Sequence, residues 1–396
     1  MSRIGVDEHA GYVRSLLTGL SARPAERVAL ADALGRVTVS PTASPIALPP
    51  FRNAQMDGYA VRAADTTDAP LALPVTGEVA AAPGEPAPLE PGTAVRIMTG
   101  APMPDGADAV VRIEDTDRGT EQVRIDAPVA AGTYVREAGS DLAEGDDVLP
   151  PGIRLASRHL AAAAASGLTH LLVRERVRVA VVSTGSELVD AGTRLAPGEL
   201  PDANGVALAA AIAATGAEVV HRGRVRDDVE RFRAKLDAAV DAGAELVITS
   251  GGISQGAYEV VRELLEPLGA WVGSVAMQPG GPQAVGVYRR VPVVAFPGNP
   301  VSAQISFEVF VAPVLRAIAK LPAVREARLP LAEPVDSVAG KRQFRRGRLT
   351  ADGAVAPVGG PGSHLVAALA ASDLLFVVPE DVTELAAGAL VDTVEL

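Results

Sequence analysis

The sequence contains no cysteine and few aromatic residues. None of its 396 residues is cysteine, which excludes disulfides, thiolate metal sites and cysteine nucleophiles. Aromatic residues make up 3% and hydrophobic residues 48%, so we expect cores built mainly from Ala, Val and Leu. At roughly 150 residues per domain, this length predicts two to four domains.

Positive charge and long apolar runs are also scarce. The net charge of −12 argues against a nucleic-acid binder, which needs a broad basic surface. The longest apolar run, Leu160 to Ala165, is far shorter than the ~20 residues of a membrane-spanning helix. The first 20 residues are charged where a signal peptide needs a continuous apolar stretch. We therefore expect a soluble, cytoplasmic protein with no nucleic-acid and no membrane partner.

The N-terminal half mixes helical and strand-like patterns. Apolar spacing predicts helices over 7–20 and 25–34, followed by a proline-rich connector at 41–51. Short Val- and Ala-rich segments between Pro and Gly turns predict a small β domain over 52–137. An alanine-rich helix follows it. We expect this helix to pack back on the N-terminal helices, so that the β domain is an insertion.

Strands alternate with helices over residues 177–320, which predicts a doubly wound parallel α/β sheet. Residues 325–396 have short strands and turns and predict a C-terminal β domain. The fold class expected is therefore multidomain α/β plus β. The predicted domains are a discontinuous linker and dimerisation domain (1–47 and 138–176), an inserted β domain (48–137), an α/β domain (177–322) and a C-terminal β domain (323–396).

Three glycine-containing loops follow strands of the predicted α/β sheet, at 183–188, 249–256 and 296–302. Ligands of open α/β sheets bind at the carboxyl ends of the strands, and such loops can hold a phosphate or another oxyanion. One loop alone has even odds of being an ordinary turn, but three at one edge favour a ligand site. None has the P-loop or dinucleotide-binding spacing. The candidate substrate-binding residues are Ser183, Thr184, Gly185, Ser250, Gly251, Gly252, Ser254, Pro297, Gly298, Asn299 and Pro300.

Acidic residues stand close to these loops. Glu187 lies in the first loop, Glu259 follows the second, and Asp227 and Asp228 follow a strand. Carboxylates beside phosphate-binding loops commonly hold Mg²⁺. For Asp228 a helix N-cap is a strong alternative, because an amphipathic helix follows it. The candidate metal ligands are Asp57, Glu187, Asp228 and Glu259.

Several segments resemble one enzyme family. FRNAQMDGYAVR (51–62), RIMTGAPMPDGADAVVRIED (96–115) and FPGNPVSA (296–303) are similar to signatures of the molybdopterin molybdenumtransferases, the family that includes the carboxy-terminal domain of gephyrin. The similarity runs from about residue 7 to residue 396 in the family's order. These motifs together are highly specific.

The resemblance implies a four-domain, elongated homodimer with its active site between the α/β domain of one subunit and the Asp57 domain of the other. It implies insertion of molybdate into adenylylated molybdopterin, release of AMP and a divalent cation, usually Mg²⁺. Molybdopterin adenylyltransferase and molybdenum-enzyme apoproteins are the partners that it suggests. The residues at positions that the family uses around the cleft are Asp57, Thr99, Asp141, Glu187 and Asp228.

One stretch departs from the family pattern. Where the family often has two lysines, MQPGGPQAVG (277–286) has Gln278 and Gly281, and a lost charge-assisted hydrogen bond is worth ~1.5–3 kcal/mol. A non-catalytic molybdopterin carrier or scaffold is therefore the alternative to the enzyme. A molybdopterin adenylyltransferase is less favoured, since it would not need the flanking domains. The arginines that could compensate, or simply form a solvated basic strand, are Arg342, Arg345, Arg346 and Arg348.

Overall fold

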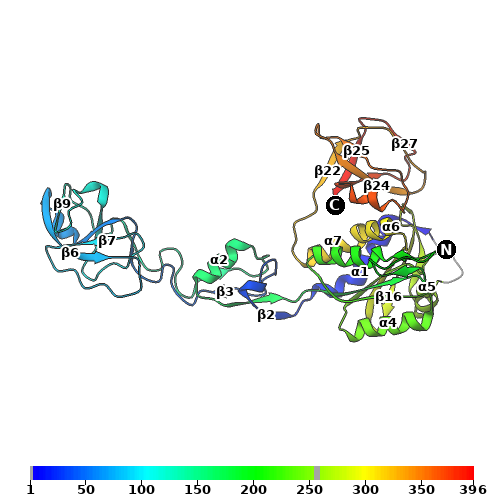
Figure 1. Cartoon of the computed structure of the whole chain (residues 1–396), viewed down its shortest axis with the longest axis horizontal. Coiled ribbons are helices and arrows are strands. Elements are labelled where there is room, and N and C mark those ends of the chain that lie inside the picture. The colour runs from blue at the N-terminus through cyan, green and yellow to red at the C-terminus, as the bar shows by residue number, and fades with distance from the viewer. Residues whose placement is uncertain (1–2, 254–258) are drawn as a thin grey trace. The chain divides into compact units, whose positions relative to one another are not determined.

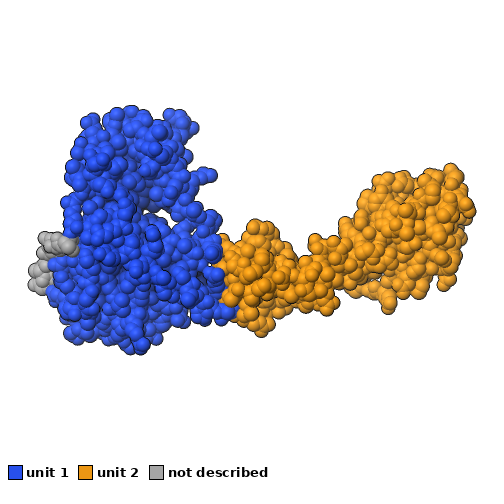
Figure 2. Space-filling model, turned by 180° about the vertical axis from the view of Figure 1, so that it is seen from behind, with its two compact units in different colours: residues 1–26, 174–396 blue, residues 27–173 orange. Residues whose placement is uncertain are grey.

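The computed structural model describes residues 3–253 and 259–396 of the chain. Predicted site residue Ser254 lies outside them. The chain divides into two compact units, residues 1–26 with 174–396 and residues 27–173, coloured separately in Figure 2. Each unit is described by itself.

The main sheet of the first unit is mixed. Strands β13, β16, β17 and β21 run parallel, as the strand–helix alternation predicts, but β20 is antiparallel to both of its neighbours. Arg289 and Arg290, both at positive φ, form the two-residue turn between β20 and β21 and make them a hairpin. Among the described residues the strand order is β1 (Arg3–Ile4), β18 (Trp271–Val275), β20 (Pro282–Tyr288), β21 (Val291–Phe296), β17 (Leu246–Ser250), β13 (Arg178–Thr184) and β16 (Glu218–Val225).

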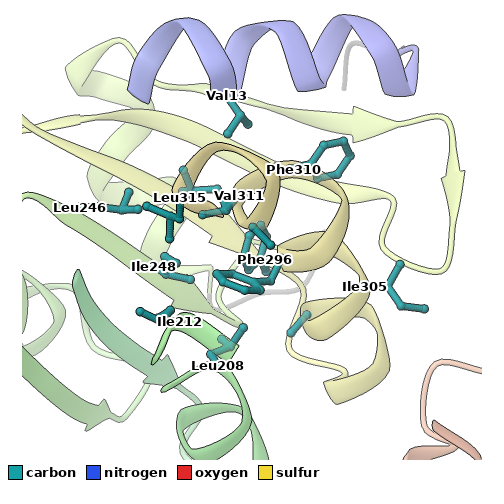
Figure 3. Close-up of a cluster of buried hydrophobic side chains, with 14 of the residues drawn as sticks. Val13, Leu208, Ile212, Leu246, Ile248, Phe296, Ile305, Phe310, Val311 and Leu315 are labelled. Carbon is teal, nitrogen blue, oxygen red and sulfur yellow. The ribbon is translucent and has the colours of Figure 1, made fainter. Parts of the chain in front are cut away.

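Each face of this sheet has its own buried core. Val179 and Val181 of β13 join one cluster, and Ala180 and Val182 join the other, as the two-residue period of a strand requires. Figure 3 shows the first cluster, where side chains of four helices meet the sheet. Those helices are α1 (Val6–Leu17), α3 (Ala203–Ala214), α6 (Pro300–Ser306) and α7 (Ala312–Ile318), whereas α4 (Val229–Asp241) and α5 (Val260–Leu265) contribute to the second cluster.

The N-terminal segment differs from the prediction in two ways. Helix α1 packs in the α/β core through Val6, Val13 and Leu17, instead of belonging to the linker domain. Its apolar stripe predicts a buried face but does not specify what covers it. The predicted helix over 25–34 is wrong: this segment forms strand β2 (Ala25–Ala29) and a short 3₁₀ turn. Pairing of β2 with β12 outweighs the high helix propensity of this segment, because tertiary context commonly overrides intrinsic propensity.

Helices α6 and α7 are joined by a π-helical segment, Phe307–Val311, into one continuous helix over Pro300–Ile318. Within the described residues, it is the one helix whose length and composition would allow it to cross a membrane. It is 61% buried inside the protein, and Phe307 and Phe310 lie in the core. Its apolar character is therefore explained by packing against the sheet.

The second unit holds a β sheet and a smaller set of paired strands. Tyr59 and Val61 face one apolar cluster of the sheet, and Ala60 faces the other. In the part of this unit that is described, the sheet order is β8 (Ala109–Arg112), β5 (Gly58–Val61), β7 (Ala94–Ile97), β6 (Leu71–Val79) and β9 (Gln122–Ile125). The other elements of this unit are β3 (Thr42–Ala43) paired with β11 (Asp147–Leu149), β4 (Asn53–Ala54) paired with β10 (Val135–Arg136), α2 (Ser157–Ala165) and β12 (His170–Arg174).

The C-terminal strands, orange and red in Figure 1, form a separate sheet of the first unit. Strand β19 (Met277–Gln278) leaves the α/β domain and pairs with β24 (Arg342–Leu349). This pairing places part of the C-terminal domain beside the loop that follows β18. The remaining elements are β22 (Glu326–Pro330), β25 (Val355–Pro357), α8 (Val366–Ala370), β26 (Leu374–Val378) and β28 (Leu390–Glu395), with the outlying strands β14 (Leu188–Val189), β15 (Leu200–Pro201), β23 (Val335–Asp336) and β27 (Glu384–Leu385).

The arginines of β24 serve the fold. Arg342 forms ion pairs with Asp7 at 2.8 Å and Glu380 at 3.1 Å. Arg345 and Arg346 are buried and donate hydrogen bonds to backbone carbonyls. The expectation of a solvated basic strand is wrong for these two, because their guanidinium groups are consumed in holding loops of the C-terminal domain.

Candidate active site

A cavity of about 680 Å³ lies at the carboxyl ends of β13, β17 and β21. The three loops expected to meet at this edge do meet there. Lining residues from the loops are Thr184, Gly185, Gly251, Gly252, Pro297, Gly298 and Asn299.

Two glycines allow the first two loops to pack closely. Gly251 and Gly252 have φ angles of +90° and +66°, which residues with side chains rarely adopt. A Cβ atom on Gly251 would lie 2.5 Å from the carbonyl oxygen of Thr184. The backbone of the second loop can therefore approach Thr184, and both then line one wall.

Other predicted substrate-binding residues support the loops from behind. Ser183 and Ser250 are buried and absent from the cavity lining as described. The Ser183 hydroxyl donates to Asp202 at 3.0 Å, and Asp202 also caps α3 by accepting from Gly205 N. Pro300 is the first residue of α6, a favourable position for proline. These residues set the loop conformations.

The third loop is fixed by two side-chain amides. Asn204 donates to the Gly298 carbonyl at 2.7 Å, and Asn299 donates to the Ser363 hydroxyl at 2.9 Å. The first contact comes from α3 and the second reaches the C-terminal domain. The loop is thereby held on both sides of the cavity.

The acidic residues divide into three that line the cavity and Asp228, which caps a helix. Glu187, Asp227 and Glu259 line the cavity. Asp228 accepts from Arg231 N at 2.8 Å and is the N-cap of α4, so its cavity role stays a prediction. Asp227 accepts from Ser186 N at 3.0 Å. The N-cap position is the alternative that the sequence already offers for Asp228, and Asp227 beside it is the member of the pair that lines the cavity.

The candidate metal ligands do not form a ready cluster. Within residues 3–253 and 259–396, no three His, Asp or Glu side chains come together to hold a metal ion. Glu187 and Asp227 line the same cavity, and the reciprocal hydrogen bond from Asp227 N to Ser186 Oγ ties their loops together. Two carboxylates with substrate oxygens and water are a usual environment for Mg²⁺.

The C-terminal domain supplies the opposite wall, which sequence reasoning missed. Lys341 lines the cavity and is the one lysine or arginine among its described lining residues. Ser363 and His364 belong to the same wall. The signal that could have pointed to Lys341 is its place directly before the basic strand, but nothing local shows that this strand pairs with β19.

Asp57 and Thr99 meet in the second unit. The Asp57 carboxylate accepts from Thr99 N at 2.7 Å and from the Thr99 hydroxyl at 2.8 Å. The backbone hydrogen bond and then the hydroxyl hydrogen bond lower the pKa of Asp57 below its usual value, because both favour the charged form. Asp57 and Thr99 are exposed. Asp141 is exposed too and contacts Leu48 through its backbone.

The chain matches three family models in succession. Residues 4–167 match the MoeA N-terminal region (domain I and II), residues 180–317 match a probable molybdopterin binding domain, and residues 328–396 match the MoeA C-terminal region (domain IV). Together these matches cover nearly the whole chain.

Similar proteins support the same assignment. The chain is 45% identical to molybdopterin molybdenumtransferase 2 of Mycobacterium tuberculosis, over 97% of each chain. It is 35% identical to molybdopterin molybdenumtransferase 1 of that organism, over 92% of this chain and 93% of the relative. A crystal structure of a molybdopterin biosynthesis MoeA protein from Pyrococcus horikosii superposes with a TM-score of 0.81 at 33% identity, covering 100% of this chain and 99% of that one. The chain belongs to the MoeA family of molybdopterin molybdenumtransferases, the enzymes that insert molybdenum into molybdopterin.

Proposed function

We propose that this protein takes adenylylated molybdopterin and molybdate as substrates, inserts the molybdenum and releases AMP, with Mg²⁺ as the divalent cation. The observation that carries this proposal is the cavity lined by three strand-end loops, by Glu187 of the first loop and Asp227 of the loop tethered to it, and by Lys341. Backbone groups of such loops suit phosphate oxygens. The acidic side chains would hold a divalent cation, which would supply positive charge for the phosphates.

Glu187 and Asp227 are the residues that would hold Mg²⁺. When bound, the ion supplies neutralisation of the charge that develops on the phosphates as the bond to AMP breaks. Lys341 adds positive charge from the opposite wall. Asn299 and the glycine backbones orient the substrate, because Asn299 is held by Ser363 of the C-terminal wall and Gly251 packs closely on Thr184.

The Asp57 carboxylate is proposed to act on the same reaction from a second copy of the chain. Its two hydrogen bonds from Thr99 keep it ionised and oriented, although its exposure means that it contributes little to folding. A homodimer is therefore part of the proposal. Molybdopterin adenylyltransferase as donor, molybdenum-enzyme apoproteins as acceptors and a cytoplasmic location complete it.

The test is single-turnover release of AMP from adenylylated molybdopterin, with molybdate and Mg²⁺ each present or absent. Release should require both, and it should be lost in Asp57→Ala and Glu187→Ala. Asp126→Ala is a matched control, because Asp126 is an exposed acid of the second unit that pairs with Arg124.

Tight binding of the adenylylated pterin without release would overturn the enzymatic proposal and leave a carrier. Gly281→Lys is then the informative variant. A Cβ atom at Gly281 would lie 3.4 Å from Ser274 Oγ and 3.5 Å from the Val275 carbonyl oxygen. The first atom of a lysine side chain therefore fits there without a severe clash.

A further inference from the structure

The orientation of one amide side chain in the cavity, that of Gln278, is determined by hydrogen bonds from the interior of the C-terminal domain. Gln278 lines the cavity at the end of β19. Its Oε1 atom accepts from Gln343 Nε2 at 2.8 Å. Gln343 Oε1 accepts from Arg345 Nη1 at 3.1 Å, and Arg345 also donates to the Asp336 carbonyl.

The direction of this chain of hydrogen bonds follows from the chemistry of its last member. A guanidinium group donates and cannot accept. Gln343 must therefore turn its oxygen toward Arg345 and its NH₂ group toward Gln278. Gln278 must in turn accept through its oxygen, which leaves its own NH₂ group as the donor available to the cavity.

Burial makes the arrangement rigid. Gln343 is 1% exposed and Arg345 is 9% exposed, so reversing either would leave a buried polar group unsatisfied. The loop backbone is held separately. Gln283, fully buried, donates to the Gly280 carbonyl at 2.8 Å and to the Ser306 hydroxyl at 2.7 Å.

We infer that Gln278 is a specificity-determining residue that presents a neutral N–H donor to an oxyanion of the substrates, and that Gln343 and Arg345 are positioning residues that fix its polarity. This inference rests on the proposed function of the cavity. Tetrahedral oxyanions accept such a hydrogen bond whether they belong to a phosphate or to molybdate. A neutral donor also adds recognition that salt screens less than it screens an ammonium group.

The decisive variant is Gln343→Glu. It keeps the size of the side chain and the acceptor for Arg345, but it can no longer donate to Gln278. The Gln278 amide then turns its NH₂ group toward the introduced carboxylate and its oxygen into the cavity. Isothermal titration calorimetry with molybdate and, separately, with pyrophosphate should show roughly ten- to hundredfold weaker binding of the contacted oxyanion to the variant. The oxyanion whose affinity falls is the one that Gln278 contacts.

A double-mutant cycle separates this effect from the added negative charge. In the Gln278→Met background, Gln343→Glu should change binding little, because the amide that it reverses is gone. A purely electrostatic effect would persist there. Gln122→Glu is a matched control, since it makes the same change at an exposed position of β9 in the second unit.

Gln278→Lys leaves Gln343 itself unchanged and tests the same idea from the cavity side, should Gln343→Glu fail to fold. It should bind the affected oxyanion more tightly than wild type at low ionic strength, with the advantage shrinking as salt is added. Wild-type protein that binds neither probe, or a Gln343→Glu effect that survives in Gln278→Met, would overturn the inference. If the variants change oxyanion binding as expected but the wild-type protein releases no AMP, the proposed function is refuted and the inference about Gln278 stands.

Discussion

The Asp57–Thr99 pair and the cavity of the first unit hold their acidic side chains in different ways. Asp57 is exposed and is oriented by a single neighbouring residue. Glu187 and Asp227 lie in a wall assembled from segments far apart in the chain. The first site is local to one small β domain, whereas the second depends on the α/β core and on the C-terminal domain.

This difference indicates which substitutions should change the reaction rate and which should change folding stability. Substituting the exposed Asp57 should change the reaction rate and leave the free energy of unfolding nearly unchanged. The cavity is supported by buried groups, among them His9, Gln283 and Gln343. Conditions that disturb those groups should therefore affect the first unit and spare the Asp57–Thr99 pair.

The largest effect is expected for Asp57→Asn. Removing the charge while keeping the shape should slow single-turnover AMP release roughly 10³-fold, or ~4 kcal/mol of barrier. The thermal unfolding midpoint should stay near that of the wild type. Asp126→Asn serves as the control for an exposed acid of the same unit. Full activity in Asp57→Asn would remove this residue from the reaction.

The two adjacent aspartates of the first unit sharpen the comparison. Asp227→Asn should slow release about 10²-fold, because Asp227 faces the cavity. Asp228→Asn should behave as wild type, since Asn caps helices as well as Asp does, while Asp228→Ala should lose about 1 kcal/mol of stability. Rate measurements and urea unfolding on the three variants check this. A large rate loss in Asp228→Asn with none in Asp227→Asn would reverse the assignment.

Acid should weaken the first unit through His9. Burial, opposed in part by Gln283, lowers the pKa of His9 to about 4. Below its usual pKa of 6.5 the unfolded chain binds the proton more readily than the folded protein does. The free energy of unfolding therefore falls as the pH drops through this window. The loss between pH 7 and pH 5 is about 2 kcal/mol.

His9→Leu should remove that part of the pH dependence, measured by urea unfolding at pH 7 and pH 5. His170→Leu is the matched control, because His170 is exposed in the second unit. The lowered pKa of Asp57 keeps its carboxylate charged over the same range. An unchanged slope in His9→Leu would show that another group senses the acid.

The smallest effect is expected for Asp7→Asn. Arg342 lowers the pKa values of Asp7 and Glu380, so their contribution is present above the usual carboxyl pKa and is lost as the pH falls through the lowered values. Asp7 is largely exposed, and the change should cost less than about 1 kcal/mol at pH 7. Unfolding measured at pH 7 and pH 3 should show the difference shrinking in acid. A difference that grows in acid would contradict the ion pair.

Much of the fold was predictable from sequence, because strand and helix periods are local. The convergence of the loops after β13, β17 and β21 follows from parallel strands. The antiparallel direction of strand β20 was not predictable, since a short apolar run does not show whether the strand pairs parallel or antiparallel with its neighbours. The segment at 25–34 formed a strand because its pairing with β12 outweighed its own helix propensity.

The candidate site was predictable only as a region. Its hydroxyl residues look alike in sequence, yet Ser183 and Ser250 are buried and absent from the described lining while Thr184 lines the cavity. Lys341 was not recognised, because it reaches the cavity through the pairing of β19 with β24.

By itself, the sequence determined the family, the absence of thiol chemistry and the edge of the sheet where the ligand loops meet. These depend on residue identity and short-range spacing, which the chain carries along its length. Only the tertiary structure decided that Asp227 lines the cavity, and that Arg345 and Gln343 set the polarity of Gln278. Those outcomes depend on which surfaces pack together, and packing joins residues that no local pattern relates.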